Sequence, residues 1–118
     1  MKNKNFLQSV KHAFIGLGSA FKKERNFKIY FINVFVTLVL NIILKFSLFQ
    51  YCIWFITICG VFSAECFNTV AEHICDKMKR EFDIEIKYIK DVAAGGVLCW
   101  GFAFYLIELA MVLYNVFA

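Results

Sequence analysis

The chain has 118 residues, of which 61% are hydrophobic and none is proline, and its mean hydropathy is +0.66. A soluble domain of this size could not bury so much apolar side chain, so the composition excludes an ordinary soluble globular protein. The net charge is +4, but the basic residues flank apolar runs. This distribution favours anionic lipid headgroups over nucleic acid as the charged partner.

Residues 3–22 have the pattern of an amphipathic helix that lies on the membrane surface, with lysines on the faces that its apolar side chains leave free. The apolar side chains that recur every three or four residues are Phe6, Val10, Phe14, Leu17 and Phe21. The fold predicted for the chain is therefore all-α and integral to a membrane, with this surface helix followed by transmembrane helices.

Three apolar runs are long enough to cross a bilayer, whose hydrocarbon core takes about 20 helical residues. They cover about 29–45, about 50–68 and about 92–117. The second helix is expected to continue into the cytoplasm to about residue 79, followed by a polar loop over 79–91. Residues 1–118 then form a single membrane domain.

The basic residues predict the orientation of these spans. Seven of the 13 Lys and Arg residues precede Ile29, five lie within 77–90, and Lys45 is the remaining one. With three spans, both clusters fall on one side. The positive-inside rule then predicts a cytoplasmic N-terminus, a cytoplasmic 77–91 loop and an external C-terminus.

A polar stripe appears where the second apolar run ends. Glu65, Asn68, Glu72 and Asp76 are spaced i, i+3, i+7 and i+11, which places them on one face of a helix. Acidic groups at a membrane boundary are costly, and they indicate a functional site that faces protein or water.

Three further polar residues, Glu24, Lys90 and Asp91, are predicted at the same cytoplasmic interface. Neighbouring carboxylates repel one another unless a cation lies between them, and oxygen ligands of this kind suit Mg²⁺, which in turn suits phosphates. Lys90 could hold an anionic phosphate as a point charge. No P-loop is present. The residues alone thus favour nucleotide-dependent chemistry on a lipid.

Simpler structural interpretations stay open for these residues. Glu24 could pair with its basic neighbours, and Lys90-Asp91 could be an interfacial anchor at a helix N-terminus. Glu72 and Asp76 could form surface ion pairs along their helix. Asn68 could bond between helices, and His73 is more typical of a surface or packing residue than of a ligand.

In three blocks the chain resembles the small prokaryotic diacylglycerol kinase family, which includes the undecaprenol kinases of Gram-positive bacteria. The first block is Gly16-Leu17 with Ala20 and Glu24-Arg25-Asn26-Phe27-Lys28-Ile29. The second is Glu65-x-x-Asn68-Thr69-x-x-Glu72-x-x-x-Asp76. The third is Lys90-Asp91-Val92-Ala93-Ala94-Gly95. Their order and spacing agree over nearly the whole chain.

The resemblance implies a homotrimeric lipid kinase of the bacterial cytoplasmic membrane, with active sites between subunits, that uses ATP and Mg²⁺ to phosphorylate a lipid hydroxyl. It implies that Glu65 is the catalytic base and that Asn68 orients the reacting groups. Glu24 and Glu72 match the carboxylates that hold the metal. The residues that match nucleotide contacts, or lie near them, are His12, Asp76, Lys90 and Asp91.

The residues of the first and third blocks resemble those of the Gram-positive branch. This resemblance favours undecaprenol as the substrate and undecaprenyl phosphate as the product. Phosphorylation of diacylglycerol to phosphatidic acid is the alternative. A non-enzymatic small oligomeric membrane protein, such as a pore, is the alternative of another class.

Two positions depart from the family pattern. Tyr30 stands where Gram-positive members usually have histidine, and Glu108 lies inside the third span without a family role. By rise per residue, Glu108 and Lys45 each lie roughly 24 Å from the cytoplasmic start of their spans. We therefore expect these two residues to pair near the outer surface.

Overall fold

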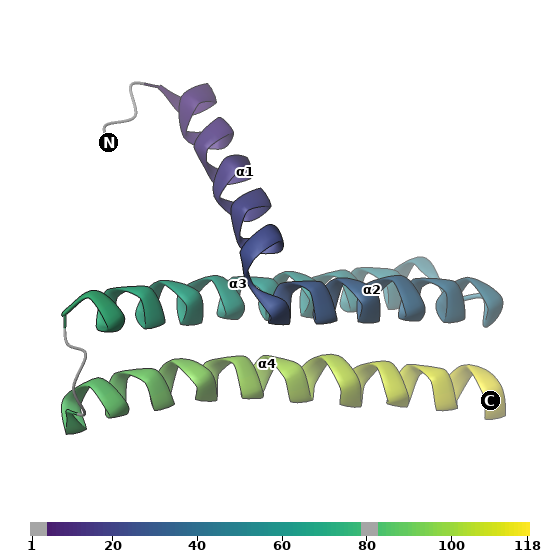
Figure 1. Ribbon diagram of the computed structural model, residues 1–118. Helices are drawn as coiled ribbons and strands as arrows, with labels where there is room; N and C mark the ends of the chain where they lie inside the picture. Colours follow the sequence, from purple (N-terminus) through teal and green to yellow (C-terminus); the bar gives the residue numbers. More distant parts are fainter. Residues whose placement is uncertain (1–4, 79–82) are drawn as a thin grey trace.

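The computed structural model describes residues 5–78 and 83–118, and four α-helices make up these two parts of the chain. Helices α2, α3 and α4 extend along nearly the same direction, and α1 projects steeply away from them (Figure 1). The helices are α1 (Phe6–Lys23), α2 (Arg25–Ile43), α3 (Leu48–Met78) and α4 (Ile84–Phe117). The predicted all-α fold is confirmed.

Three of these helices, α2, α3 and α4, are long and apolar enough to cross a membrane. Large apolar side chains stay exposed along all three, as a lipid-facing surface requires. The chain is thus an integral membrane protein, as its composition predicts. The buried apolar core is small and contains Phe46, Trp54, Val61, Phe104 and Met111.

Helix α1 differs in its placement and its ends. Asn5 caps its N-terminus, because the side-chain oxygen accepts a hydrogen bond of 2.8 Å from the backbone N–H of Gln8. Residues 3 and 4 of the predicted surface helix lie outside the described residues. At the other end, Glu24 alone separates α1 from α2, and its extended backbone turns the chain sharply. The bend therefore places the Glu24 side chain at the foot of α1.

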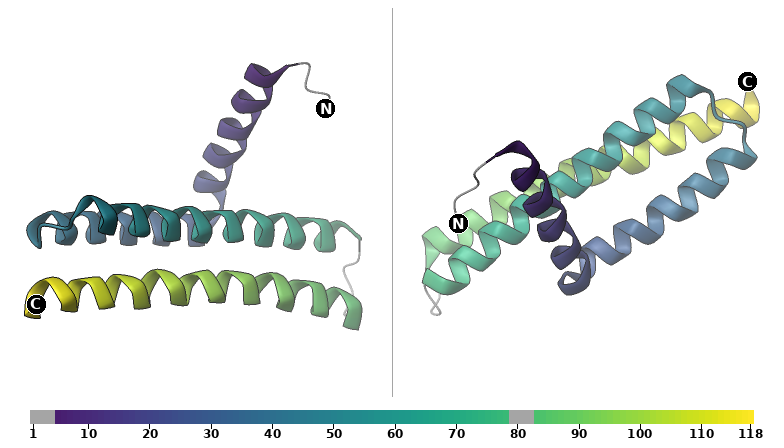
Figure 2. Two further views of the ribbon diagram at one scale, coloured as in Figure 1. Left: turned by 180° about the vertical axis from the view of Figure 1, so that it is seen from behind. Right: turned by 90° about the horizontal axis from the view of Figure 1, so that it is seen from above.

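An aromatic cluster lies at that foot, where α1 crosses α3 and reaches the start of α2 in the view from above (Figure 2). Phe21 of α1 packs against Phe27 of α2 and Phe62 of α3, with ring centroids 5.4 Å apart in both pairs. Phe27 is completely buried. These contacts fix the angle between α1 and the membrane helices.

Helices α3 and α4 pack along most of their length (Figures 1 and 2). The packing is tight at Gly60, where an added Cβ atom would overlap the ring of Trp100. At Gly101 an added Cβ would lie 3.2 Å from the Tyr30 hydroxyl of α2, whereas Gly95 and Gly96 have open space around them. Small residues therefore allow close helix packing at Gly60 and Gly101 within this chain.

The turn between α2 and α3 has a defined geometry. Lys45 has a φ of 56° and follows the C-cap residue Leu44. The backbone N–H of Lys45 donates to the carbonyl of Ile42 at 3.2 Å, and that of Phe46 donates to the carbonyl of Asn41 at 3.0 Å. This is the Schellman arrangement of a helix C-terminus, and the Phe46 side chain that follows Lys45 is buried.

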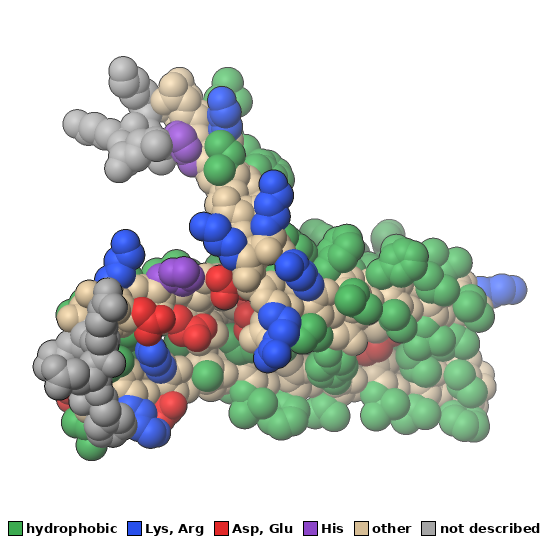
Figure 3. Space-filling view, viewed as in Figure 1, with side chains coloured by type: hydrophobic (Ala, Val, Ile, Leu, Met, Phe, Trp, Pro, Cys, Tyr) green, Lys and Arg blue, Asp and Glu red, His purple; other side chains and the backbone are tan. Residues whose placement is uncertain are grey.

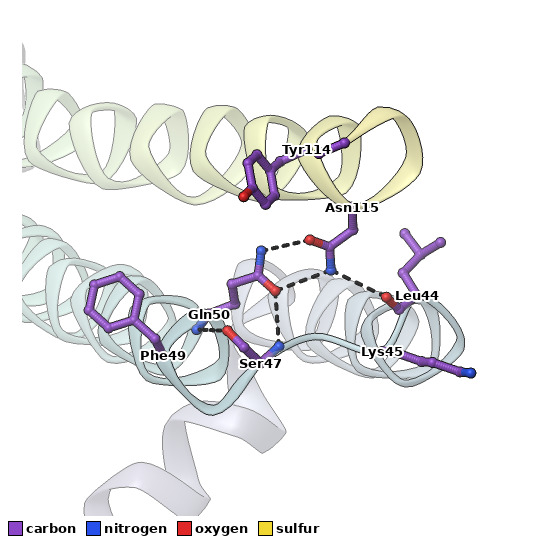
Figure 4. A pocket seen from close by; sticks show the side chains of 8 residues that line it. Leu44, Lys45, Ser47, Phe49, Gln50, Tyr114 and Asn115 are labelled. Atoms are coloured by element: carbon purple, nitrogen blue, oxygen red, sulfur yellow. Dashed lines mark hydrogen bonds between the residues drawn. The ribbon is translucent and has the colours of Figure 1, made fainter.

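Side-chain hydrogen bonds connect this turn to the last part of α4 (Figure 4). The Asn115 amide donates to the carbonyl of Leu44 at 3.2 Å, and the Gln50 amide donates to the Asn115 oxygen at 2.8 Å. An open hollow of ≈ 710 Å³ lies beside them. The Lys45 side chain points away from α4 in this view.

Two expectations from the sequence are wrong. The predicted loop 79–91 is helical from Ile84 onward, because Asp83 caps α4 by accepting hydrogen bonds from the backbone N–H groups of Glu85 and Ile86; residues 79–82 lie outside the described residues. Likewise, Glu108 does not pair with Lys45 among the described residues. Glu108 instead accepts a hydrogen bond from Asn41, which lies one helical turn before Lys45. The left-handed backbone at Lys45 directs that side chain outward instead.

Candidate active site

The acidic stripe lies on a single uninterrupted helix. Helix α3 has 31 residues, so it is roughly 46 Å long, whereas the hydrocarbon core of a bilayer is about 30 Å thick. The helix is therefore longer than the hydrocarbon core is thick, and the stripe lies in its C-terminal half. Figure 3 shows the Asp and Glu side chains gathered near this end of α3 and beside the foot of α1.

Glu65 is the buried member of the stripe, with only 2% of its surface exposed. The side-chain amide of Asn26, in the first turn of α2, donates to its Oε1 atom at 3.4 Å. Glu24 and Glu72 lie close enough to act on this carboxylate electrostatically. The structure thus brings Glu24, Glu65 and Glu72 into one electrostatic environment.

Asn68 and Glu72 are joined along α3. The Asn68 amide donates to Glu72 Oε1 at 2.9 Å, an i, i+4 bond that fixes the orientation of the amide. Glu24 reaches the same region from the junction of α1 and α2, and its Oε2 atom lies 3.5 Å from Nε2 of His73 on α3. In the part of the chain that the structure describes, Glu24 thus faces α3 rather than its basic neighbours.

Lys90 connects the N-terminal part of α4 to α3. Its ammonium group donates to Asp76 Oδ1 at 2.8 Å. The hydrogen bond and charge of Lys90 lower the pKa of Asp76, and the hydrogen bond from Lys90 to Asp76 raises the pKa of Lys90. Asp91 points elsewhere and bonds to Lys87 on its own helix. The two adjacent residues Lys90 and Asp91 therefore have different partners.

His12 occupies a separate place between α1 and α3. It lines an apolar hollow of ≈ 320 Å³ together with Gly16, Ala20, Cys66 and Thr69, among others. Two residues that line this hollow, Cys66 and Thr69, directly follow Glu65 and Asn68 in the chain. Within residues 5–78 and 83–118, however, His12 forms no hydrogen bond with another predicted site residue. The structure thus links six of the eight predicted residues through hydrogen bonds or electrostatic contacts, and Asp91 and His12 lie outside this group.

Two residues of this region had no predicted role. Asn26 holds Glu65, and His73 faces Glu24. Asn26 is the polar residue two positions after Glu24 at the charged junction, so its proximity to the site could have been inferred. His73 directly follows Glu72 on a helix, and nothing in the local pattern indicates its contact with the distant Glu24.

The carboxylates fit a magnesium nucleotide better than a metal ion held by protein alone. No group of three or more His, Cys, Asp or Glu side chains among the described residues is placed to hold a metal ion. Mg²⁺ in phosphoryl-transfer sites is commonly bound by one or two carboxylates, with waters and substrate phosphates completing its octahedron. Glu24 and Glu72 are the two carboxylates predicted to hold the metal, and each acts electrostatically on Glu65.

Comparisons with known proteins agree with this chemistry. The family model described as prokaryotic diacylglycerol kinase matches residues 11–113, which include every predicted site residue. The undecaprenol kinase of Bacillus subtilis (strain 168) is 33% identical over 92 residues, which cover 78% of this chain and 75% of that protein. No solved structure matches significantly. The match sets aside the alternative of a non-enzymatic membrane protein.

A buried carboxylate, two acidic residues that act on it electrostatically, and the Lys90–Asp76 bond between α4 and α3 therefore lie inside the matched segment. This chain is a lipid kinase and belongs to the prokaryotic diacylglycerol kinase family.

Proposed function

We propose that this enzyme transfers the γ-phosphate of ATP to the hydroxyl group of undecaprenol and so forms undecaprenyl phosphate. The observation that carries the proposal is the buried Glu65, which lies where α3 leaves the membrane, beside Glu24 and Glu72. The relative named undecaprenol kinase supports the choice of lipid. Diacylglycerol, which the family description names, is the second candidate.

Glu65 is the proposed general base. A lipid alcohol reaches a membrane protein from the bilayer, and its hydroxyl lies near the headgroups, so a carboxylate at the membrane edge can meet it. Glu65 accepts the hydroxyl proton as the oxygen attacks phosphorus. Asn26 holds one carboxylate oxygen at 3.4 Å, which leaves the other available to the substrate. Asn68, fixed by Glu72, orients the reacting groups.

The nucleotide side of the site is proposed on the cytoplasmic surface. Glu24 and Glu72 would hold Mg²⁺, which neutralises phosphate charge when bound. Lys90 places a positive charge where anionic phosphates would arrive, and its bond to Asp76 keeps the ammonium group beside α3. Asp91 and His12 are the remaining proposed nucleotide contacts. The hollow at His12 offers an apolar surface for a nucleotide base.

We propose a homotrimer of the bacterial cytoplasmic membrane, with the N-terminus and residues 77–91 in the cytoplasm. Two carboxylates per protomer leave metal positions open for nucleotide oxygens or for groups of a neighbouring subunit. The twelve Lys and Arg residues before Ile29 and within 77–90 support the orientation.

The test compares purified protein carrying Glu65→Gln with the wild type in a lipid-phosphorylation assay. General-base catalysis contributes about 10²- to 10⁴-fold, and we expect a loss of kcat of this size, with folding and ATP binding retained. Glu85→Gln is the matched control, because Glu85 is an exposed carboxylate in the first turn of α4. A fully active Glu65→Gln enzyme would refute the assignment of the base.

The lipid is tested by competition. With undecaprenol and diacylglycerol present together in equal amounts, we expect undecaprenyl phosphate to be the main product. A predominance of phosphatidic acid would replace undecaprenol with the second candidate and leave the role of Glu65 unchanged.

A further inference from the structure

A second buried carboxylate lies deep in the membrane helices, far along the chain from the proposed site. Glu108 of α4 is 7% exposed, and Asn41 of α2 is completely buried. The Asn41 amide nitrogen donates to Glu108 Oε1 at 3.3 Å. This bond joins α2 directly to α4, two helices that have few other contacts with each other.

Two oxygen atoms of this pair have no hydrogen-bond partner among the described residues: Asn41 Oδ1 and Glu108 Oε2. An amide oxygen only accepts hydrogen bonds, and so does each oxygen of an ionised carboxylate. Both atoms would then be buried acceptors without a donor, which is costly in a medium that contains no water.

A proton on Glu108 Oε2 would give both unpartnered oxygen atoms a hydrogen-bond partner. The resulting hydroxyl would donate to Asn41 Oδ1 while the Asn41 amide donates to Glu108 Oε1, and the two planar groups would then form a closed pair with two hydrogen bonds. A protonated acid also removes a negative charge from the bilayer.

The surroundings offer no competing partner within the described residues. Asn41 is the only polar side chain that acts on Glu108. On α4 its helix-face neighbours are the buried, apolar Phe104 and Met111. Lys45, in the turn after α2, is exposed, and Tyr51 of α3 packs against the rings of Phe46 and Trp54.

We infer that Glu108 is held as an uncharged carboxylic acid in the membrane and that its two-bond pair with Asn41 fastens α2 to α4. The pair is a buried proton site with a structural role, separate from lipid phosphorylation.

Infrared spectroscopy of the full-length protein in lipid vesicles at neutral pH tests the protonation state. The difference spectrum of wild type minus Glu108→Gln should contain the C=O stretching band of a protonated carboxylic acid. A difference spectrum with carboxylate bands alone would overturn the inference. The measurement uses no substrate, so its outcome is independent of the proposed kinase chemistry.

Stability measurements test the pairing. Glutamine can replace the acid because its amide also donates one bond to Asn41 and accepts one, so Glu108→Gln should fold as stably as wild type. Glu108→Met and Asn41→Leu should each weaken the folding equilibrium by about 3- to 18-fold, the range of single interhelical hydrogen bonds. The fold-decrease in the folding equilibrium constant of the double variant should be smaller than the product of the fold-decreases in the two single variants.

Strictly multiplicative losses in the two apolar variants, or a Glu108→Gln protein as unstable as Glu108→Met, would show that the pair does not exist. If the apolar variants fail to assemble, the infrared spectrum of Glu108→Gln still decides the protonation state.

Discussion

The two buried carboxylates, Glu65 and Glu108, lie in different environments. Each receives one hydrogen bond from an asparagine of α2, Asn26 or Asn41. Glu65 also lies within electrostatic reach of Glu24 and Glu72. Among the described residues, Asn41 is the one side chain that forms a hydrogen bond with Glu108. The first environment suits proton transfer, and the second suits structural pairing.

The left-handed backbone conformation of Lys45 leads to a testable prediction about stability. A non-glycine residue in this conformation costs about 1–2 kcal/mol, and glycine adopts it without that cost but loses about 0.5–1 kcal/mol through its unfolded-state entropy. Lys45→Gly should therefore raise the free energy of unfolding by up to about 1.5 kcal/mol. Lys45→Gln keeps the backbone cost and removes the charge, so it is the control. Denaturant titration in micelles gives both values, and equal stabilities of the two variants would contradict the prediction.

The Asp76–Lys90 bond predicts a pH dependence. The pKa of Asp76 is lower in the folded protein than in the unfolded chain because Lys90 donates to it. Its contribution to stability is thus complete at neutral pH and is lost as the pH falls through the lowered folded-state pKa. Both side chains are substantially exposed, so the effect on stability is small.

NMR titration of the Asp76 carboxyl carbon tests this directly. In Lys90→Met the pKa of Asp76 should rise to its ordinary value. In Lys87→Met it should stay low, because Lys87 pairs with Asp91. An unchanged Asp76 titration in Lys90→Met would mean that the bond does not form in the membrane-bound protein.

At the scale of the helices, the tight contact between α3 and α4 at Gly60 predicts a steric effect. Gly60→Ala places a methyl group against the Trp100 ring, and overpacking of this kind costs about 1–3 kcal/mol. Gly96→Ala is the matched control, because the space around Gly96 is open and alanine is the better helix former. The unfolding free energies of both variants in micelles check the prediction. A Gly60→Ala protein as stable as Gly96→Ala would show that Trp100 moves aside freely.

The helices themselves could be predicted from the sequence, because hydropathy and apolar spacing are local properties of the chain. The start of α4 was also encoded locally: Asp83 precedes the helix as an N-cap, but the charged residues around it resemble a loop. The side-chain contacts that connect one helix to another could not be predicted in the same way. The partners of Glu108 and Glu65 lie 67 and 39 residues away in the chain, and depth along a span alone pointed to Lys45 for Glu108.

At the scale of the whole molecule, the three spans and the Lys and Arg clusters predict which surface faces the cytoplasm. The test uses a variant in which all five cysteines are replaced by alanine and adds Lys45→Cys or Lys87→Cys. A membrane-impermeant maleimide should label the Lys45→Cys protein in intact cells and the Lys87→Cys protein only after permeabilisation. The reverse labelling pattern would invert the proposed topology.

The short connection between α2 and α3 also bears on how the protein enters its membrane. Residues 44–47 are all that separates the two helices, and Lys45 is the one charged residue among them. In the proposed orientation, insertion of α2 and α3 must translocate only these four residues, and Lys45 is their single positive charge. The membrane potential opposes the movement of this charge by about 2.3 kcal/mol per 100 mV. Two adjoining apolar helices can insert together as a hairpin against so small a barrier, without a motor that threads an extended polar domain across the bilayer.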